Sequence, residues 1–510
     1  MSVDRRSFLR LGASAAVASQ LSRAPASMGP GPVRTRLASW DVLRATVSGD
    51  VFLPGDAGYE EATHLQVAAY DTIRPQGIVY CETASDVRDC LLFAQDLDLQ
   101  VALRSGGHCN AGYSTTTGMV VDVSRLDQVA VGSTSVAMGA GTQAVDALTV
   151  LAPQGLATPN GTCATVAAGG FVTGGGIGPL TRKYGAACDN LVGAQVVTAD
   201  GRIISTSPYE KSDLFWALRG GGGGNFGVVT QYRIRPVPVT TMVSYLLSWP
   251  WDAAPQVIRA WQDWLTALSP DVAANLLITL PNAAPGVVPI VQVSGTSLGT
   301  QADLETELNE LAALVGTAPA ARAVLDQPYR QTMMALWGCP TKTPAQCHRV
   351  GHNPEAELPR NIFAMHRGRF FGRSIPQDGI ASLLTAFEGA RRAGQARVLS
   401  FRAMGGKVNE KSRTETAFVH RTSKFYLGLA YVLIDPAATA DDKAAMLGVL
   451  DQGFAAMDPY SNGESFQNFM DPSLADWRQA YYGENYRRLV QVKRRYDPDG
   501  FFHFQQSIGS

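Results

Sequence analysis

Two glycine-dense stretches constrain this chain more than any other feature. The first is Arg104-Ser105-Gly106-Gly107-His108, and the second runs from Gly161-Thr162-Cys163 through two further glycine groups to Gly178. A residue without a Cβ lets the backbone approach a bulky anionic ligand and turn its amides toward it. The two stretches therefore predict a site for a large phosphorylated cofactor.

Each stretch also carries one reactive side chain. His108 ends the first stretch and Cys163 lies near the start of the second, among residues too small to shield it. Imidazole and thiol groups can both act as nucleophiles. The two side chains therefore allow two covalent bonds to one cofactor.

Five motifs, taken together, carry a family resemblance. They are R-S-G-G-H at 104–108, G-T-C-A-T-V-A-A-G-G with G-G-G-I-G at 161–178, A-L-R-G-G-G-G-G-N-F-G-V-V-T at 217–230, Y-Y-G-E-N-Y-R-R-L at 481–489 and Y-D-P-D-G-F-F at 496–502. They resemble the berberine bridge enzyme-like flavin oxidases of the vanillyl-alcohol oxidase superfamily over nearly the whole chain. The resemblance implies an α+β, two-domain FAD-binding fold.

The resemblance also implies how FAD is held. In the family a histidine and a cysteine bond a ring methyl and a ring carbon of the isoalloxazine, and His108 and Cys163 match them. A small valine three residues after the cysteine is associated with dioxygen access, so Val166 favours an oxidase, although valine is also a common core residue. The other cofactor-binding positions implied are Arg104, Ser105, Gly106, Gly107, Gly112, Gly169, Gly170, Gly174, Gly175, Gly176, Gly178, Asn225, Gly227, Val228 and Asn468.

Length and charge narrow the class of partner. At 510 residues the chain is too long for one ordinary core, so two or three domains are expected. A formal net charge of −1 gives no field for nucleic acid or an anionic membrane. The sequence has no C-x-x-C pair and no H-E-x-x-H motif. We therefore expect a small-molecule substrate and dioxygen as partners, and no metal.

The N-terminus has the features of a twin-arginine export signal. Asp4-Arg5-Arg6-Ser7-Phe8-Leu9-Arg10 precedes a weakly apolar stretch and Ala24-Pro25-Ala26. A flexible basic tail is the alternative. We expect residues 1–26 to be removed and the protein to be secreted or periplasmic. No later stretch approaches the ~20 apolar residues that span a bilayer, so stable membrane insertion is not expected.

Export would place the cysteines in an oxidising compartment. Cys339 and Cys347 flank a short loop with two prolines, which predicts a local disulfide. The pairing of Cys81, Cys90, Cys109 and Cys188 stays open.

The residue pattern changes near Pro236, where glycine clusters give way to alternating strands and helices, and this change predicts the domain boundaries. Residues 27–236 hold the glycine clusters, with strands expected at 78–81, 101–103, 119–123, 129–131, 192–198 and 228–234 and helices at 84–97 and 143–151. The glycine run 220–224 lies between an apolar helix and a strand, so a flavin-facing loop is favoured over a linker. Residues 237–458 alternate strands with helices near 254–267, 301–314, 377–393 and 440–457, which predicts a substrate-binding domain. The family motifs return at 459–510, so the FAD-binding domain is expected to be discontinuous.

Glu410 is the predicted catalytic base. Plant members of the family carry it in a strand that reads Y-G-G-K-M-S-E, and residues 404–410 here read M-G-G-K-V-N-E. On a strand, Met404, Gly406, Val408 and Glu410 would share one face, and an apolar face makes a carboxylate a stronger base. The alternative is an exposed glutamate paired with a lysine.

Several tyrosines of the family's bacterial sugar oxidases are missing. The Y-x-N-Y motif is Phe466-Gln467-Asn468-Phe469, and Ile177 and Met404 stand at two further tyrosine positions. The pocket should therefore be more apolar than that of a sugar oxidase. The alternative proton acceptors are Tyr113, Tyr481, Tyr482, His348, His352, His366 and His420, for which core or surface roles are the simpler explanation.

These features predict an FAD-dependent oxidase. It should take hydride from a carbon bearing, or conjugated to, a hydroxyl of a bulky secondary metabolite, and pass the electrons to dioxygen to give hydrogen peroxide. A carbohydrate or oligosaccharide oxidase is the alternative enzyme, and a non-catalytic flavin-binding protein is the alternative of another class. Flavin bleaching without oxygen would separate the three.

Overall fold

The computed structural model describes residues 39–510, and the expected α+β class is confirmed. The predicted export signal, residues 1–26, lies outside the described residues. Short helices α1 (Trp40–Thr46) and α2 (Tyr59–Thr63) open the described part.

A β-α-β unit delivers the first flavin motif. Strands β2 (Gly77–Tyr80) and β3 (Val101–Arg104) both run parallel to β4 (Met119–Asp122), and β1 (Val51–Phe52) completes the sheet. Helix α3 (Ala84–Asp96) starts where predicted, because Thr83 and Asp86 form a capping box. Since β3 ends at Arg104, the R-S-G-G-H loop begins at its carboxyl end.

A second, antiparallel sheet follows. Its order is β5 (Val129–Val131), β6 (Val136–Gly139), β10 (Val228–Ile234), β8 (Leu191–Val197) and β9 (Ile203–Thr206). Short strands β7 (Leu156–Ala157) and β11 (Val237–Pro238) pair separately. The helices of this region are α4 (Ala144–Leu151), α5 (Ala168–Thr173), α6 (Thr181–Tyr184) and α7 (Ser212–Ala217).

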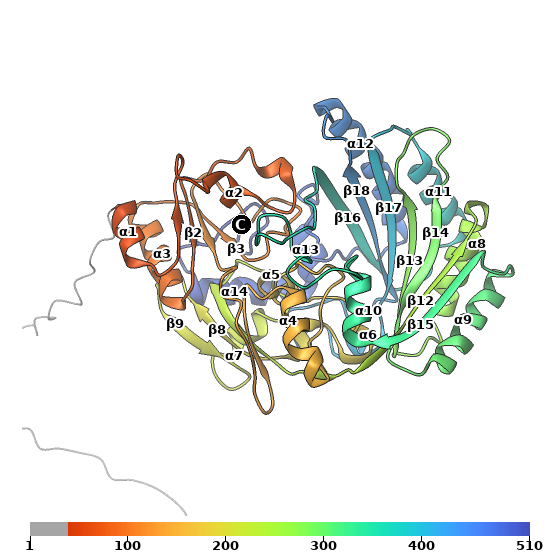
Figure 1. The fold of residues 1–510 in the computed structure, drawn as a ribbon, viewed down its shortest axis with the longest axis horizontal. Coiled ribbons are helices and arrows are strands. Elements are labelled where there is room, and N and C mark those ends of the chain that lie inside the picture. Colours follow the sequence, from red (N-terminus) through yellow and green to blue (C-terminus); the bar gives the residue numbers. More distant parts are fainter. Residues whose placement is uncertain (1–38) are drawn as a thin grey trace, which may run out of the picture. The chain divides into compact units, whose positions relative to one another are not determined.

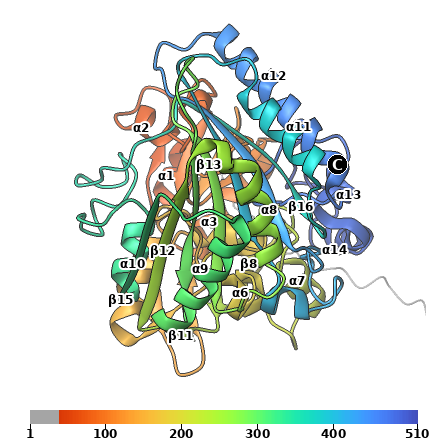
Figure 2. The same ribbon diagram turned by 90° about the vertical axis from the view of Figure 1, so that its right-hand side faces the viewer.

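The predicted substrate-binding region is a seven-stranded antiparallel sheet. Its order is β15 (Ala321–Pro328), β12 (Thr241–Trp249), β14 (Ile290–Ser297), β13 (Val272–Leu280), β17 (Gln395–Ala403), β18 (Phe425–Leu433) and β16 (Phe363–Phe371). Helices α8 (Ala254–Trp264), α9 (Gln301–Val315), α11 (Gln377–Glu388) and α12 (Ala440–Met457) cover one face, as Figures 1 and 2 show, and α10 (Tyr329–Leu336) follows β15. Helix α11 ends five residues earlier than expected, because Gly389 and Ala390 leave the helical conformation.

The C-terminal segment returns to the first two sheets, as expected for a discontinuous flavin domain. Helices α13 (Trp477–Tyr482) and α14 (Tyr486–Tyr496) lie beside the glycine loop 220–227, where Tyr482 lies next to Gly222 and Leu489 lies next to Gly221. Lys493 Nζ donates to the Asn225 carbonyl at 2.8 Å, and the Ile508 amide donates to Asn225 Oδ1 at 2.9 Å. The described residues 39–510 belong to one compact unit, and the exact domain boundaries at 236 and 458 stay predictions.

The described residues bear on the predicted disulfide and on the search for membrane-spanning helices. The predicted disulfide between Cys339 and Cys347 is confirmed. The remaining described cysteines, Cys81, Cys90, Cys109, Cys163 and Cys188, are free. None of the described helices is both long enough and apolar enough to cross a membrane.

Removing the buried cation that ties the C-terminal segment to the glycine loop should destabilise the fold. The Lys493→Met variant leaves the fully buried Asp497 carboxylate without its cation, at a cost of about 3 kcal/mol. The matched control is Arg495→Met on the same helix, whose pair with Asp213 is largely exposed and contributes less than about 1 kcal/mol. Urea unfolding followed by tryptophan fluorescence checks this, and equal losses in both variants would contradict it.

Candidate active site

A cavity of about 540 Å³ lies where the glycine motifs meet. Strand β3 and the loop after it, the segment that precedes α5 and the loop 220–227 all contribute to its wall. Residues 466–470 and 502–505 of the C-terminal segment complete that wall. Arg402 on β17 is the one residue that the seven-stranded sheet, as described, supplies to it.

The cavity has the features of a cofactor cradle. A Cβ added at Gly170 would meet nothing within 4 Å, and at Gly224 the nearest atom would be 3.7 Å away. Both glycines line the cavity, so their missing side chains leave space for a ligand. Buried Arg104 pairs with Asp122 and also lines the cavity, where its Nη1 has no hydrogen-bond partner among the described residues. Glycine loops with many backbone amides, next to the Nη1 of Arg104 that has no partner among residues 39–510, suit the pyrophosphate of FAD.

His108 joins the first two motifs. Its Nε2 lies 2.7 Å from Thr165 Oγ1, so the loop after β3 is in hydrogen-bond contact with the segment that carries Cys163. Burial, and then the charge of Arg349, lowers the pKa of His108 to about 4. The imidazole is therefore neutral above that pH and able to act as a nucleophile. Thr165 was not predicted; its position two residues after Cys163 was the available signal.

Cys163 faces the same cavity. The surrounding walls desolvate its thiol and raise its pKa, and the nearby charge of Arg402 partly opposes this effect. Val166 lines the cavity three residues later.

Most predicted cofactor positions are brought together on this wall. Those that line the cavity are His108, Cys163, Arg104, Ser105, Gly106, Gly107, Val166, Gly169, Gly170, Asn225, Gly227, Val228 and Asn468.

Five predicted cofactor glycines lie off the cavity wall: Gly112, Gly174, Gly175, Gly176 and Gly178. Protein atoms fill the space that a side chain would need at these positions, and direct contact of these glycines with FAD stays a prediction. A Cβ at Gly178 would lie 1.7 Å from the Asn160 carbonyl oxygen, and one at Gly174 would lie 2.2 Å from Asn468 Nδ2. Glycine occupies these positions because other parts of the chain approach them too closely for a side chain.

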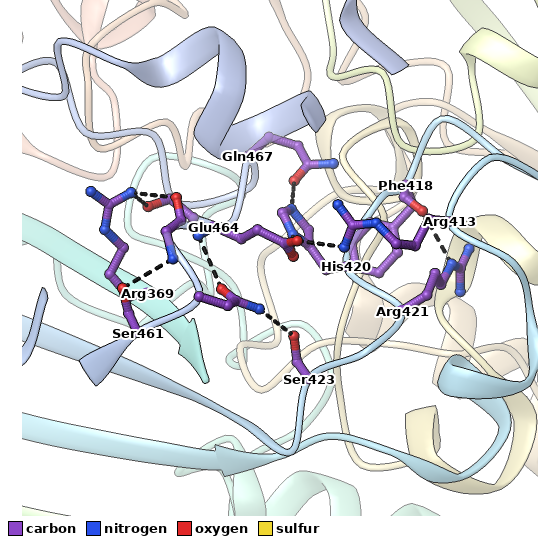
Figure 3. A network of polar contacts seen from close by, with 12 residues as sticks. Arg369, Arg413, Phe418, His420, Arg421, Ser423, Ser461, Glu464 and Gln467 are labelled. Carbon is purple, nitrogen blue, oxygen red and sulfur yellow. Dashed lines mark hydrogen bonds and ion pairs between the residues drawn. The ribbon is translucent and has the colours of Figure 1, made fainter. Parts of the chain in front are cut away.

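A buried polar network stands behind the cavity wall at Gln467. In Figure 3, His420 lies between Glu464 and Gln467: its Nδ1 is 2.8 Å from Glu464 Oε2 and its Nε2 is 3.0 Å from Gln467 Oε1. Arg413 also pairs with Glu464. Gln467 Nε2 donates to the Gly220 carbonyl at 2.6 Å, which fixes the amide at the start of the glycine loop. His420 therefore positions a cavity residue and does not itself reach the cavity.

The structure does not bring Glu410 to the cavity. The predicted strand is wrong here: Gly405 and Gly406 have φ of 86° and 56°, and residues Gly406–Glu410 form a 3₁₀ turn. Glu410 pairs with Lys407 three residues away, and 61% of its side chain is exposed. Its position matches the alternative of an exposed, lysine-paired glutamate.

The alternative tyrosines divide into two groups. Tyr113 lines the cavity, and its hydroxyl lies 3.3 Å from Gln505 Oε1. Tyr481 and Tyr482 are buried off the wall, where the Tyr481 hydroxyl accepts a hydrogen bond from the Asp471 amide.

The histidines of the predicted substrate domain also lie off the wall. His366 packs against Phe469 with the two rings tilted, and burial lowers its pKa to about 3, so it is neutral at ordinary pH. His348 and His352 stack on each other, with His348 Nε2 3.1 Å from Asp146 Oδ1. His503 lines the cavity, although no motif pointed to it.

One part of the wall is aromatic and apolar. Phe466 and Phe469 line the cavity together with Ile177, at the positions where tyrosines are missing, and Phe171 adds a third ring. Within residues 39–510 no group of three or more His, Cys, Asp and Glu side chains is placed to hold a metal ion.

Comparisons with known proteins agree with this site. A family model for an FAD-binding domain matches residues 75–207, and one described as "Berberine and berberine like" matches residues 465–509. The FAD-linked oxidoreductase YgaK of Bacillus subtilis is 26% identical over 91% of this chain and 98% of its own. Berberine bridge enzyme-like 9 of Arabidopsis thaliana is 27% identical over 86% of this chain and 84% of its own.

A solved structure shares the fold. Glucooligosaccharide oxidase from Acremonium strictum, which is described with a 6-S-cysteinyl, 8α-N1-histidyl FAD, superposes with a TM-score of 0.80 at 21% identity and covers 91% of this chain and 98% of its own. The two family models fall on the segments that build the cavity from both ends of the sequence. The chain therefore carries an FAD-binding domain and a berberine-like C-terminal segment, and it is similar over most of its length to berberine bridge enzyme-like FAD-linked oxidoreductases.

Proposed function

We propose that the protein is a bicovalent flavoprotein oxidase in which His108 and Cys163 both bond FAD. The observation that carries the proposal is the contact of His108 Nε2 with Thr165 Oγ1 at 2.7 Å, inside the cavity that Cys163 also faces. Thr165 engages Nε2 and leaves Nδ1 as the ring nitrogen free to bond carbon. The 8α-N1-histidyl link of glucooligosaccharide oxidase uses that nitrogen and supports the assignment.

The proposed reaction is the removal of hydride from a carbon bearing, or conjugated to, a hydroxyl on a bulky metabolite. When bound, FAD would supply the hydride acceptor, the hydroxyl proton would pass to solvent, and dioxygen would take up the two electrons with two protons to give hydrogen peroxide. The chain's own residues hold and surround it: glycine loops offer backbone amides, and Phe466 and Phe469 keep water from the wall. Val166 leaves room for a small gas molecule.

An oligosaccharide oxidase is the second candidate, because a glucooligosaccharide oxidase shares the fold. The missing hydroxyls at Phe466 and Phe469 favour a less polar substrate, since sugars need many hydrogen-bonding partners. Mixing the oxygen-free holoenzyme with oligosaccharides, phenols and polyketide alcohols tests the choice. Bleaching of the flavin by oligosaccharides alone would favour the second candidate, and no bleaching by any compound would favour a non-catalytic flavin protein.

We further propose that the protein is exported in folded form. The twin-arginine pattern at 4–10 supports this, and a disulfide at Cys339 and Cys347 suits an oxidising compartment.

The two flavin links should be separable by mutation. Protein precipitated in acid should stay yellow, because covalent FAD survives unfolding. His108→Ala and Cys163→Ala should each keep one link, and the double variant should release all its flavin. Absorbance of the redissolved pellet and the mass of flavin peptides measure this, and a colourless wild-type pellet would defeat the proposal.

Enlarging Val166 should slow oxygen access selectively. Val166→Leu adds one methylene to the cavity wall and should slow reoxidation of the reduced flavin by roughly tenfold, with anaerobic reduction almost unchanged. Stopped-flow absorbance measures both half-reactions. Equal slowing of the two would indicate a packing defect.

Glu410→Gln should leave flavin reduction within about twofold of wild type. Glu410 is exposed and paired with Lys407, so it takes no proton at the cavity. Anaerobic stopped-flow reduction measures the rate. A loss of ~10²-fold or more, the usual worth of a general base, would restore Glu410 as the proton acceptor.

A further inference from the structure

Arg402 is a cation on the cavity wall that has no counterion among residues 39–510. Its guanidinium reaches the cavity from β17, beside Cys163. Its side-chain acceptors are Ser400 Oγ at 3.4 Å and Thr162 Oγ1 at 3.5 Å, both at the outer limit of hydrogen bonding. No carboxylate of residues 39–510 lies within 4.0 Å of it.

Other buried arginines of this region have short hydrogen bonds or ion pairs within the protein. Arg367 pairs with Asp451 and Asp471, and Arg421 pairs with Asp189. Arg397, on the same strand as Arg402, donates to three backbone carbonyls at 2.6–2.8 Å. The fold thus supplies partners to arginines whose role is structural, and it supplies none of comparable quality to Arg402.

The neighbours of Arg402 cannot serve as its anion. Burial raises the pKa of the Cys163 thiol, and a cysteine bonded to flavin carbon is an uncharged thioether. Burial also raises the pKa of the Tyr426 phenol, so it stays neutral. The Phe469 ring, 5.5 Å from the guanidinium carbon, offers only a weak cation–π contact.

We propose that Arg402 binds an anionic oxygen of the substrate, either a carboxylate or an ionised hydroxyl. The inference rests on the proposed function and deepens it, because it gives the bulky, partly apolar substrate a charge. A planar, positively charged guanidinium binds a carboxylate or a phenolate more strongly than it binds a neutral oxygen. Phe466, Phe469 and Ile177 on the same wall suit an aromatic or conjugated frame. The substrate class is therefore an aromatic or conjugated acid whose anionic oxygen lies at the Cys163 end of the cavity.

Binding of three aromatic probes to the oxidised holoenzyme tests the proposal without turnover. The probes are benzoate, pentafluorophenolate and neutral benzamide, and each is titrated against the visible flavin spectrum. We expect at least one anion to bind ~10²-fold more tightly than benzamide. Preference for benzoate alone identifies a carboxylate, preference for pentafluorophenolate alone an ionised hydroxyl, and preference for both a site for either oxygen.

Variants at Arg402 assign the preference to this residue. Arg402→Met should abolish the anion preference and leave benzamide binding within about threefold, whereas Arg402→Lys should retain part of the preference. Arg373→Met removes an exposed arginine after β16 and is the charge-matched control, which should bind all three probes as wild type does. If Arg402→Met fails to fold, Arg402→Gln and Arg402→Lys still separate charge from packing.

Three results would overturn the inference. One is equal binding of benzamide and both anions by the wild type, and another is equal loss of all three probes in Arg402→Met. The third is a shifted flavin midpoint potential in Arg402→Met with an unchanged anion preference, which would assign the cation to the reduced flavin. Failure of the covalent-link experiment with a retained anion preference would count against the bicovalent proposal alone.

Discussion

One side-chain amide holds together the glycine turns on which the cavity depends. Asn468 Nδ2 donates to the Gly170 carbonyl at 2.8 Å, and its Oδ1 accepts from the Gly176 amide at 3.0 Å. These partners lie nearly 300 positions away in the sequence, so the amide replaces local backbone pairing with a long-range contact. Positions 174–176 hold glycines because the Asn468 amide and other side chains occupy the space that a Cβ would need. Helix α5 can then present Gly169 and Gly170 to the cavity.

Two kinds of charged group stand near the cavity, and their partners distinguish them. Glu464 is held by His420 and Arg413, and the pKa of its carboxyl is lowered by these two groups against the effect of burial. That network is closed within the protein and fixes Gln467 at the wall. Arg402 faces the cavity, where its guanidinium is desolvated and no carboxylate of the described part of the chain pairs with it. Charged groups that are all paired within the protein favour rigidity, whereas a cation without a protein partner favours binding of anionic ligands.

The sequence was most informative where local patterns decide the structure. The parallel unit from β2 to β4, the capping box at Thr83 and the disulfide at Cys339 all follow from neighbouring residues. Glu410 was misplaced because two glycines at positive φ end the strand early, and a motif match carries no information on φ. The same alternation, followed backward from Met404, leads to Arg402 on β17, where the strand is real. Whether a long side chain finds a partner depends on distant segments, so the lack of a counterion at Arg402 could not be predicted.

The cavity wall joins residues that are translated far apart in time. Tyr113 contacts Gln505 across 392 positions of sequence, and residues 502–505 complete the wall that begins at β3. A ribosome therefore exposes the histidine and cysteine motifs long before it makes the residues that enclose them. The cavity wall is therefore complete only after nearly the whole chain has been made.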